Sequence, residues 1–213
     1  GTVPALVPPA LLSLLVGLGQ GLLHGLGPDH CAAIATLGSG GGRRKPLRVA
    51  LSFAWAHTVV LGALAGACLA LGVGLSEAFE RWAERLGGFV LVGLAVSAVL
   101  FPGTLHHGHP NLPPHGHDHR HPQLGSVAGA LMAVSGARAL ALALPPLLVG
   151  GALHFAGWVY LPAFGAGVFL AMAGVGAAVS TGTRWLSPLG AARLQRVVAL
   201  SSGALGLVWI ALA

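Results

Sequence analysis

The sequence predicts an all-α integral membrane protein with six transmembrane helices. Of its 213 residues, 55% are hydrophobic and only 8% are charged, whereas soluble domains carry about 25% charged residues. Apolar runs long enough to cross about 30 Å of hydrocarbon recur along the whole chain. The 34 glycines fit this class, because small residues let membrane helices approach closely. We expect the six spans near residues 6–37, 47–74, 85–101, 126–150, 151–181 and 193–213.

Basic residues gather in the odd-numbered connections and set the expected orientation. The second connection, around residues 77–85, holds fewer basic than acidic residues. By the positive-inside rule, the odd connections face the cytoplasm and both termini face outward. Six crossings require the same alternation. We therefore assign the net charge of +6 to membrane topology and not to nucleic-acid binding. The basic residues concerned are Arg43, Arg44, Lys45, Arg48, Arg184, Arg193 and Arg196.

The spans divide into two sets of three around a histidine-rich loop. Residues 1–101 form the first half, residues 102–125 the loop, and residues 126–213 the second half. An odd number of spans in each half inverts the second half relative to the first. Inverted repeats are common in secondary transporters, where the binding site lies near the midplane at the repeat interface. His57 and His154, each in the second span of its half, support this repeat.

A single acidic residue, Asp29, lies inside an apolar span, and His24 and His30 flank it. Ionisable groups inside a membrane usually mark an ion or proton path, and this trio suits a borderline transition metal. A straight helix would place Asp29 roughly 140° around from His24, so the side chains would not converge. Gly25 permits unusual backbone angles, and Pro28 suits the first turn of a new helix. We expect one helical segment to end near His24 and another to begin at Pro28. The alternative is a buried Asp–His pair that only holds helices together.

The heptapeptide His24-Gly-Leu-Gly-Pro-Asp-His30 matches the HX4DH signature of the nickel/cobalt transporter (NiCoT) family. The segment Ser-Phe-Ala-Trp-Ala-His-Thr-Val-Val at residues 52–60 resembles the second motif of that family. The six spans and the histidine-rich loop resemble its shorter relatives, which include urease-accessory-type membrane proteins and nickel/cobalt efflux proteins. This resemblance implies that His24, Asp29 and His30 bind the metal and that His57 contributes to its path. The later acidic motifs of the eight-span members are not recognised in this sequence.

His57 and Cys31 extend the candidate metal path beyond the motif. His57 either lines the path or forms a hydrogen bond that packs helices, and Thr58 is a candidate partner for its second nitrogen. Cys31 follows His30 directly and is a weaker candidate for the path. Because Cys31 and Cys68 both lie in predicted spans without a Cys-x-x-Cys pattern, we expect no structural disulfide.

Two further polar residues lie in the second half. His154 either faces the path or lies at the membrane interface, where Trp158 and Tyr160 are candidate anchors. Arg138 has three interpretations. It pairs with Asp29 in the empty site, lies on a re-entrant turn that reaches cytoplasmic water, or extends its charged group to the interface.

The loop packs seven histidines into the sixteen residues 106–121. Such a tract cannot bury a core and is expected to be disordered without metal. It would collect Ni²⁺, Co²⁺, Zn²⁺ or Cu²⁺ with little discrimination, which predicts a cytoplasmic metal store or delivery arm. Its internal position and irregular spacing argue against an expression tag. The histidines are His106, His107, His109, His115, His117, His119 and His121.

Together these features predict a secondary transporter for Ni²⁺ and Co²⁺ in the cytoplasmic membrane of a prokaryote. Inward movement of a dication gains about 4.6 kcal/mol per 100 mV of membrane potential, so uptake needs no ATP. Proton-coupled efflux, in which histidines carry the protons, and a metal sensor or delivery protein remain alternatives. Zn²⁺ remains an alternative substrate.

An enzyme is not expected from this sequence. An intramembrane metalloenzyme would need an open metal position and a general base, but the spans contain one carboxylate and no His-Glu-x-x-His motif. No cofactor is required beyond the transported ion. The expected partners are that ion, the lipid bilayer and a cytoplasmic metallochaperone.

Overall fold

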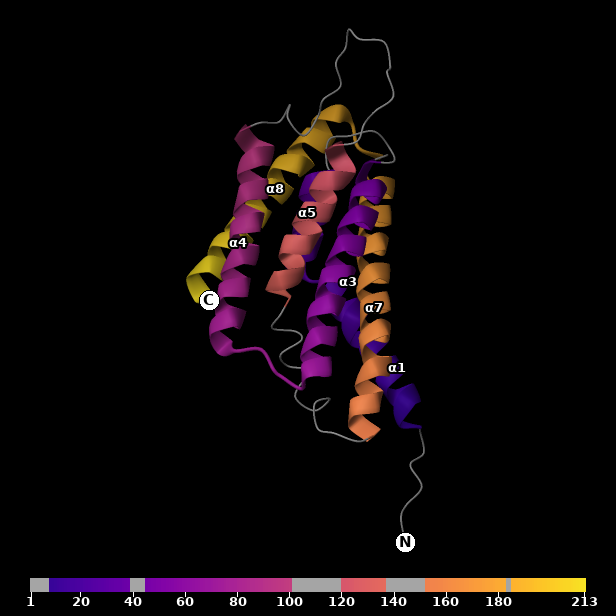
Figure 1. The fold of residues 1–213 in the computed structure, drawn as a ribbon. Helices are drawn as coiled ribbons and strands as arrows, with labels where there is room; N and C mark the ends of the chain where they lie inside the picture. The colour runs from indigo at the N-terminus through magenta and orange to yellow at the C-terminus, as the bar shows by residue number, and fades with distance from the viewer. Residues whose placement is uncertain (1–7, 39–44, 101–119, 137–151, 183–184) are drawn as a thin grey trace.

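The described chain is entirely helical (Figure 1). The computed structural model describes residues 8–38, 45–100, 120–136, 152–182 and 185–213, and these residues contain no strand. Seven α-helices lie within these ranges. They are α1 (Pro9–Gly25), α2 (Pro28–Gly38), α3 (Lys45–Leu71), α4 (Glu77–Leu100), α5 (Arg120–Ser135), α7 (Ala152–Gly182) and α8 (Pro188–Leu212).

Four of these helices, α3, α4, α7 and α8, are long and apolar enough to cross a membrane. Helices α1 and α2 meet this criterion as a pair that is bent by 53°. The predicted all-helical class is confirmed, and the long apolar helices are consistent with membrane insertion. The count of six crossings stays a prediction, because α5 is short and much of the predicted span 126–150 lies outside the described residues.

The predicted break in the first span is confirmed. Helix α1 ends at Gly25, and α2 begins at Pro28. The N–H of Gly27 donates to the carbonyl of His24 at 2.9 Å, which closes the last turn of α1. Pro28 has no N–H of its own to leave unpaired. The chain therefore changes direction within two residues, at little cost in backbone hydrogen bonds.

Helix α4 begins eight residues before the predicted boundary at residue 85, so the segment 77–85 is helical and not a connection. The hydroxyl of Ser76 accepts a hydrogen bond from the N–H of Phe79 at 3.3 Å and caps the helix. Glu77 and Glu80 lie in the first turn, where negative charge interacts favourably with the helix dipole. A hydropathy pattern does not register these capping interactions.

The end of the histidine-rich loop is also helical, because α5 begins at Arg120. The boundary expected at residue 126 is therefore wrong by six residues. Pro122 lies in the first turn of α5, a position where proline is tolerated because its missing N–H would have no partner in the helix.

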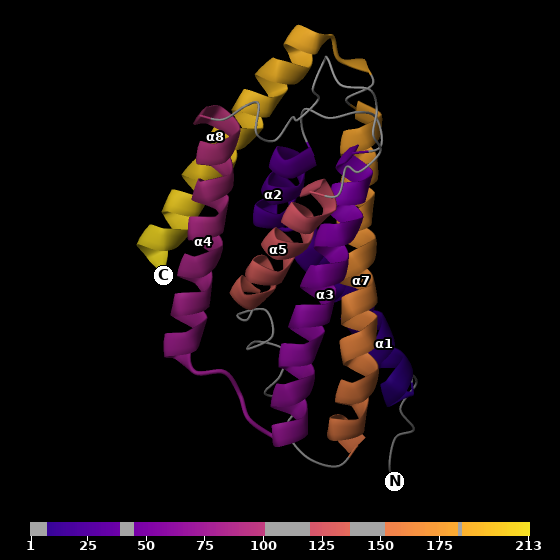
Figure 2. The ribbon, with the colours of Figure 1, turned by 45° about the horizontal axis from the view of Figure 1, so that its top comes forward.

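Helix pairing links the two halves of the chain. Helix α1 packs along α7, and α5 packs along α3 (Figures 1 and 2). The first helix of each half therefore lies against the second helix of the other half. Helices α4 and α8 pack together, as do α3 and α7. Exchanging the halves leaves these four pairs unchanged. The inversion of one half relative to the other stays a prediction from the sequence.

Glycines bring the paired backbones into direct contact. A methyl group at Gly21 on α1 would overlap the backbone carbonyl of Phe164 on α7. In the same way, a methyl group at Gly129 on α5 would overlap the carbonyl of Phe53 on α3. Such close approach is typical of small residues at membrane helix interfaces. The two contacts hold α1 and α3 in fixed positions relative to the second half.

We predict that Gly21→Ala lowers the free energy of unfolding by about 1–3 kcal/mol, because the added methyl group forces α1 and α7 apart. Gly19→Ala is the matched control, since no atom outside the local backbone lies within 4 Å of a methyl group at that position. The control should be neutral or slightly stabilising, because alanine favours helix. Unfolding followed by circular dichroism in detergent measures both, and equal effects would contradict the close approach.

Candidate metal centre

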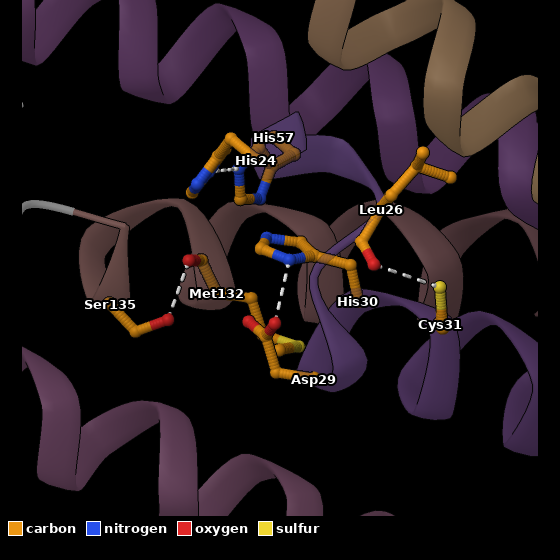
Figure 3. A network of polar contacts seen from close by, with 8 residues as sticks. All are labelled: His24, Leu26, Asp29, His30, Cys31, His57, Met132 and Ser135. Atoms are coloured by element: carbon orange, nitrogen blue, oxygen red, sulfur yellow. Dashed lines mark hydrogen bonds and ion pairs between the residues drawn. The ribbon is translucent and has the colours of Figure 1, made fainter. Parts of the chain in front are cut away.

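Three histidines converge at the break between α1 and α2 (Figure 3). His24 lies in the last turn of α1, His30 in the first turn of α2, and His57 on α3. One ring nitrogen from each can be chosen so that all three lie within 4.8 Å of one another. The Nε2 atoms of His24 and His57 are 3.4 Å apart. His30 and His57 are buried, and His24 is partly buried.

The break brings the side chains of His24 and His30 together, which a straight helix would not do. The 53° bend between α1 and α2 brings the two ring centroids to 4.8 Å, and the ring of His30 lies 4.7 Å from that of His57. Gly27 leaves the space for this turn. A methyl group at Gly27 would lie 2.5 Å from Oδ1 of Asp29 and 3.0 Å from Nδ1 of His30.

Asp29 lies behind His30, outside the group of three imidazoles. Nδ1 of His30 is 3.0 Å from Oδ1 of Asp29, and both side chains are buried. A carboxylate only accepts hydrogen bonds, so Nδ1 of His30 carries the proton and its N–H donates a hydrogen bond to Asp29. The lone pair of His30 is then at Nε2. Metal-binding histidines commonly have this carboxylate partner, which fixes the ring and raises its basicity.

The Nε2 atom of His30 is buried and has no hydrogen-bond partner among the described residues. A buried polar atom without a partner costs about 1–3 kcal/mol. Bound metal would remove this cost, because Nε2 is the atom that Asp29 leaves free to coordinate. The orphaned nitrogen is therefore an observation that points to a ligand at this position.

Two phenylalanines enclose the imidazoles. Phe53, one turn before His57 on α3, stacks on its ring with centroids 5.9 Å apart and an angle of 12° between the planes. Phe164 of α7 lies 5.6 Å from the ring of His24. Because α7 belongs to the second half, both halves of the chain surround the site. These apolar walls strengthen electrostatic interactions at the site, because they lower the local dielectric constant.

The donor set suits a borderline divalent transition metal. Imidazole nitrogens bind such an ion at about 2.0–2.1 Å, so two of them on a tetrahedral ion are about 3.4 Å apart. The distance between His24 Nε2 and His57 Nε2 equals this value. Mg²⁺ and Ca²⁺ prefer oxygen ligands and fit this group poorly.

Two of the weaker predictions are not supported by the positions of the side chains. The thiol of Cys31 donates to the carbonyl of Leu26 at 3.5 Å and lies apart from the three rings (Figure 3). The hydroxyl of Thr58 makes no hydrogen bond within the described part of the chain and lines an apolar groove between α3 and α7. Thr58 therefore does not hold the ring of His57.

Several other candidates lie outside the described residues. These include Arg138 and the loop histidines from His106 to His119. His121 and His154 fall in the first turns of α5 and α7, but their side-chain positions are likewise outside the description.

One polar contact near the site was not expected from the sequence. The hydroxyl of Tyr160 on α7 donates to Oε1 of Gln20 on α1 at 2.5 Å. Tyr160 is buried, which does not fit the expected interfacial anchor. Gln20 lies one turn before His24, and Tyr160 lies one turn before Phe164. The signal in the sequence was that Gln20 lies four residues before His24, which places both side chains on the same side of α1.

Comparison of the chain with protein-family models, curated proteins and solved structures gives no match. The resemblance to the nickel/cobalt transporter family thus stays an expectation based on the residues of the two motifs.

We predict that Asp29→Asn lowers the affinity of the site for Ni²⁺ roughly 10–100-fold, as expected when the hydrogen-bonded partner of a metal ligand is altered. The neutral amide is a weaker acceptor for His30 and no longer offsets the charge of the ion. Isothermal titration calorimetry would measure the affinity in protein whose seven loop histidines are replaced by glutamine. Cys31→Ser is the matched control and should bind as the parent does. Equal affinities for Asp29→Asn and the control would rule out this role for Asp29.

Proposed function

We propose that the protein is a secondary transporter that carries Ni²⁺ and Co²⁺ across the cytoplasmic membrane. The observation that carries this proposal is the group formed by His24, His30 and His57, whose ligand atoms lie within 4.8 Å of one another. The group lies at the break of an apolar helix pair. Discontinuous helices are typical places for ion sites in transporters, because polar backbone groups freed at the break can line a cavity.

Each residue of the site has a distinct role in this proposal. His24, His30 and His57 replace part of the hydration shell of the ion, and the remaining position stays open to water. Asp29 orients His30 and supplies one negative charge against the dication. The N-terminal dipole of α2 stabilises that carboxylate, since Asp29 lies in the first turn. Binding thus depends on side chains from both segments of the broken helix.

Transport requires that the site open alternately to the two sides. In the proposed six-span arrangement of inverted halves, the halves rock against each other around the ion. Phe164, from the second half, contacts His24 of the first half, so such a movement changes the access to the imidazoles directly. An inside-negative potential favours uptake by about 4.6 kcal/mol per 100 mV for a dication. The histidine-rich loop would receive the ion and pass it to a cytoplasmic metallochaperone.

We predict that the protein in proteoliposomes accumulates radiolabelled Ni²⁺ when an inside-negative potential is imposed. Asp29→Asn and His57→Ala should lower the initial rate at least tenfold, because each disturbs the imidazole group. Cys68→Ala, a buried substitution outside the site, is the control and should transport as the parent does. Binding of Ni²⁺ without flux in the parent and in all three variants would favour a metal sensor. Ni²⁺ flux that requires an opposing proton gradient would favour efflux.

Replacing the seven loop histidines with glutamine should leave the initial rate and the ion preference of this flux nearly unchanged. The substitutions should instead lower the number of metal ions that each protein binds at equilibrium. The physical reason is that histidine-rich tracts bind metals by affinity order, whereas the buried site imposes a fixed geometry. Competition by Co²⁺ and Zn²⁺ against labelled Ni²⁺ measures the preference. A changed order of competition would assign selectivity to the loop.

A further inference from the structure

The polar side chains of α1 form a single stripe that leads to the metal site. Helix α1 contains three of them, Ser13, Gln20 and His24, and its other residues are apolar or glycine. They are separated by seven and four residues. At about 100° per residue, all three fall within about 40° of one another around the helix. Gly17, between Ser13 and Gln20 on this side of the helix, packs against the backbone carbonyl of Tyr160, so the stripe runs along the edge of the contact between α1 and α7 to the imidazole group.

Gln20 is exposed although it lies deep in a predicted span. It is about 6 Å from His24 along the helix axis, while Ser13 is about 16 Å away. The hydrogen bond from Tyr160 uses the amide oxygen of Gln20, and the amide N–H groups need acceptors of their own. Lipid supplies none, and an unpaired polar group in hydrocarbon costs several kcal/mol. Water on this side of α1 would satisfy the amide.

The second half supplies the opposite wall of this stripe. Tyr160, bonded to Gln20, stacks on Phe164 with ring centroids 5.8 Å apart. Phe164 in turn lies 5.6 Å from His24. From the beginning of α1 toward the site, the contacts are thus the hydrogen-bonded pair of Gln20 and Tyr160, then the ring of Phe164, and then the imidazole of His24. Phe164 therefore lies between the polar pair and His24 in this series of contacts.

The opposite side of the break has a different character. Asp29, His30 and Thr36 on α2 have exposed fractions of 4%, 2% and 0%. Asp29 and Thr36 share one face of α2, because they are seven residues apart. On the α1 side of the site Gln20 is therefore exposed and Ser13 and His24 are partly exposed, whereas the three polar side chains on the α2 side are buried.

We propose that a water-filled vestibule follows the stripe Ser13–Gln20–His24, and that the transported divalent cation uses it to reach the imidazoles from the face where α1 begins. The hydroxyl of Tyr160 and the amide oxygen of Gln20 hold the hydrated ion outside Phe164, where it sheds water before it binds His24. This inference rests on the proposed function for the identity of the ion. The vestibule itself rests on the position of Gln20 and its contact with Tyr160.

Thiol labelling tests the vestibule without requiring transport. In a Cys31→Ser, Cys68→Ser background, single cysteines are placed by Gln20→Cys and by Leu15→Cys. Leu15 is 55% exposed and lies about 7 Å nearer the beginning of α1, but about 140° around from Gln20. A membrane-impermeant methanethiosulfonate reagent that carries a trimethylammonium group is added to oriented vesicles from each side in turn. Labelling after denaturation normalises the rates.

Ser76→Cys provides the reference for sidedness. Ser76 is exposed in the connection between α3 and α4, at the same end of the bundle as the beginning of α1 (Figure 1). The vestibule predicts that Gln20→Cys is labelled at least tenfold faster than Leu15→Cys, and from the same side as Ser76→Cys. Labelling of Leu15→Cys at an equal or higher rate would overturn the vestibule. Labelling of Gln20→Cys only from the side opposite to Ser76→Cys would also overturn it.

A nickel flux measurement on the parent protein separates the two proposals. Rapid labelling of Gln20→Cys together with no nickel flux would sustain the vestibule and refute nickel transport. Nickel flux together with slow labelling of Gln20→Cys would sustain transport and refute this vestibule.

Discussion

The structure depends on keeping a carboxylate buried among apolar helices. Asp29 can remain there because Nδ1 of His30 donates to it at 3.0 Å and the beginning of α2 contributes positive potential. Both conditions require the helix to restart at Pro28, and the turn before it requires the absence of a side chain at Gly27. The same hydrogen bond determines that Nε2 of His30 is the free nitrogen and faces His24 and His57. One contact thus couples the stability of the break to the geometry of the imidazole group.

Close helix packing gives this centre a fixed frame in which the two halves play unequal roles. Phe53 and Phe164 occupy matching positions in the two halves. The backbone carbonyl of each packs against a glycine on the first helix of the other half. One turn later, however, α3 has His57 and α7 has Val168. The first half therefore provides the three imidazoles, and the second half provides apolar side chains with the same backbone packing. If the halves move against each other as proposed, the imidazoles would stay together on the first half while the apolar side chains of the second half move over them.

The sequence was sufficient for the features that depend on local chemistry. Gly27 and Pro28 lie at the break, and the isolated carboxylate at Asp29 identifies the region of the site. Gly25 instead ends α1 in close contact with Val168 and Ala171 of α7, and its φ is not positive, so the unusual backbone angles expected there are not observed. What the sequence did not determine depends on neighbours in space. The role of Asp29 as the partner of His30 and the bond between Tyr160 and Gln20 arise only when helices assemble. The early start of α4 reflects the Ser76 cap, which hydropathy does not detect. Arg138 and most of the loop remain predictions from sequence.

Nickel K-edge X-ray absorption is the most direct test of the claim that three imidazoles hold the ion. The measurement would use protein with the loop histidines replaced by glutamine and loaded with one equivalent of Ni²⁺. We predict three imidazole ligands in this protein and two in its His57→Ala variant, with Asp29 absent from the coordination shell. A shell with one imidazole, or one that His57→Ala leaves unchanged, would contradict the assignment of His24, His30 and His57 as the metal centre.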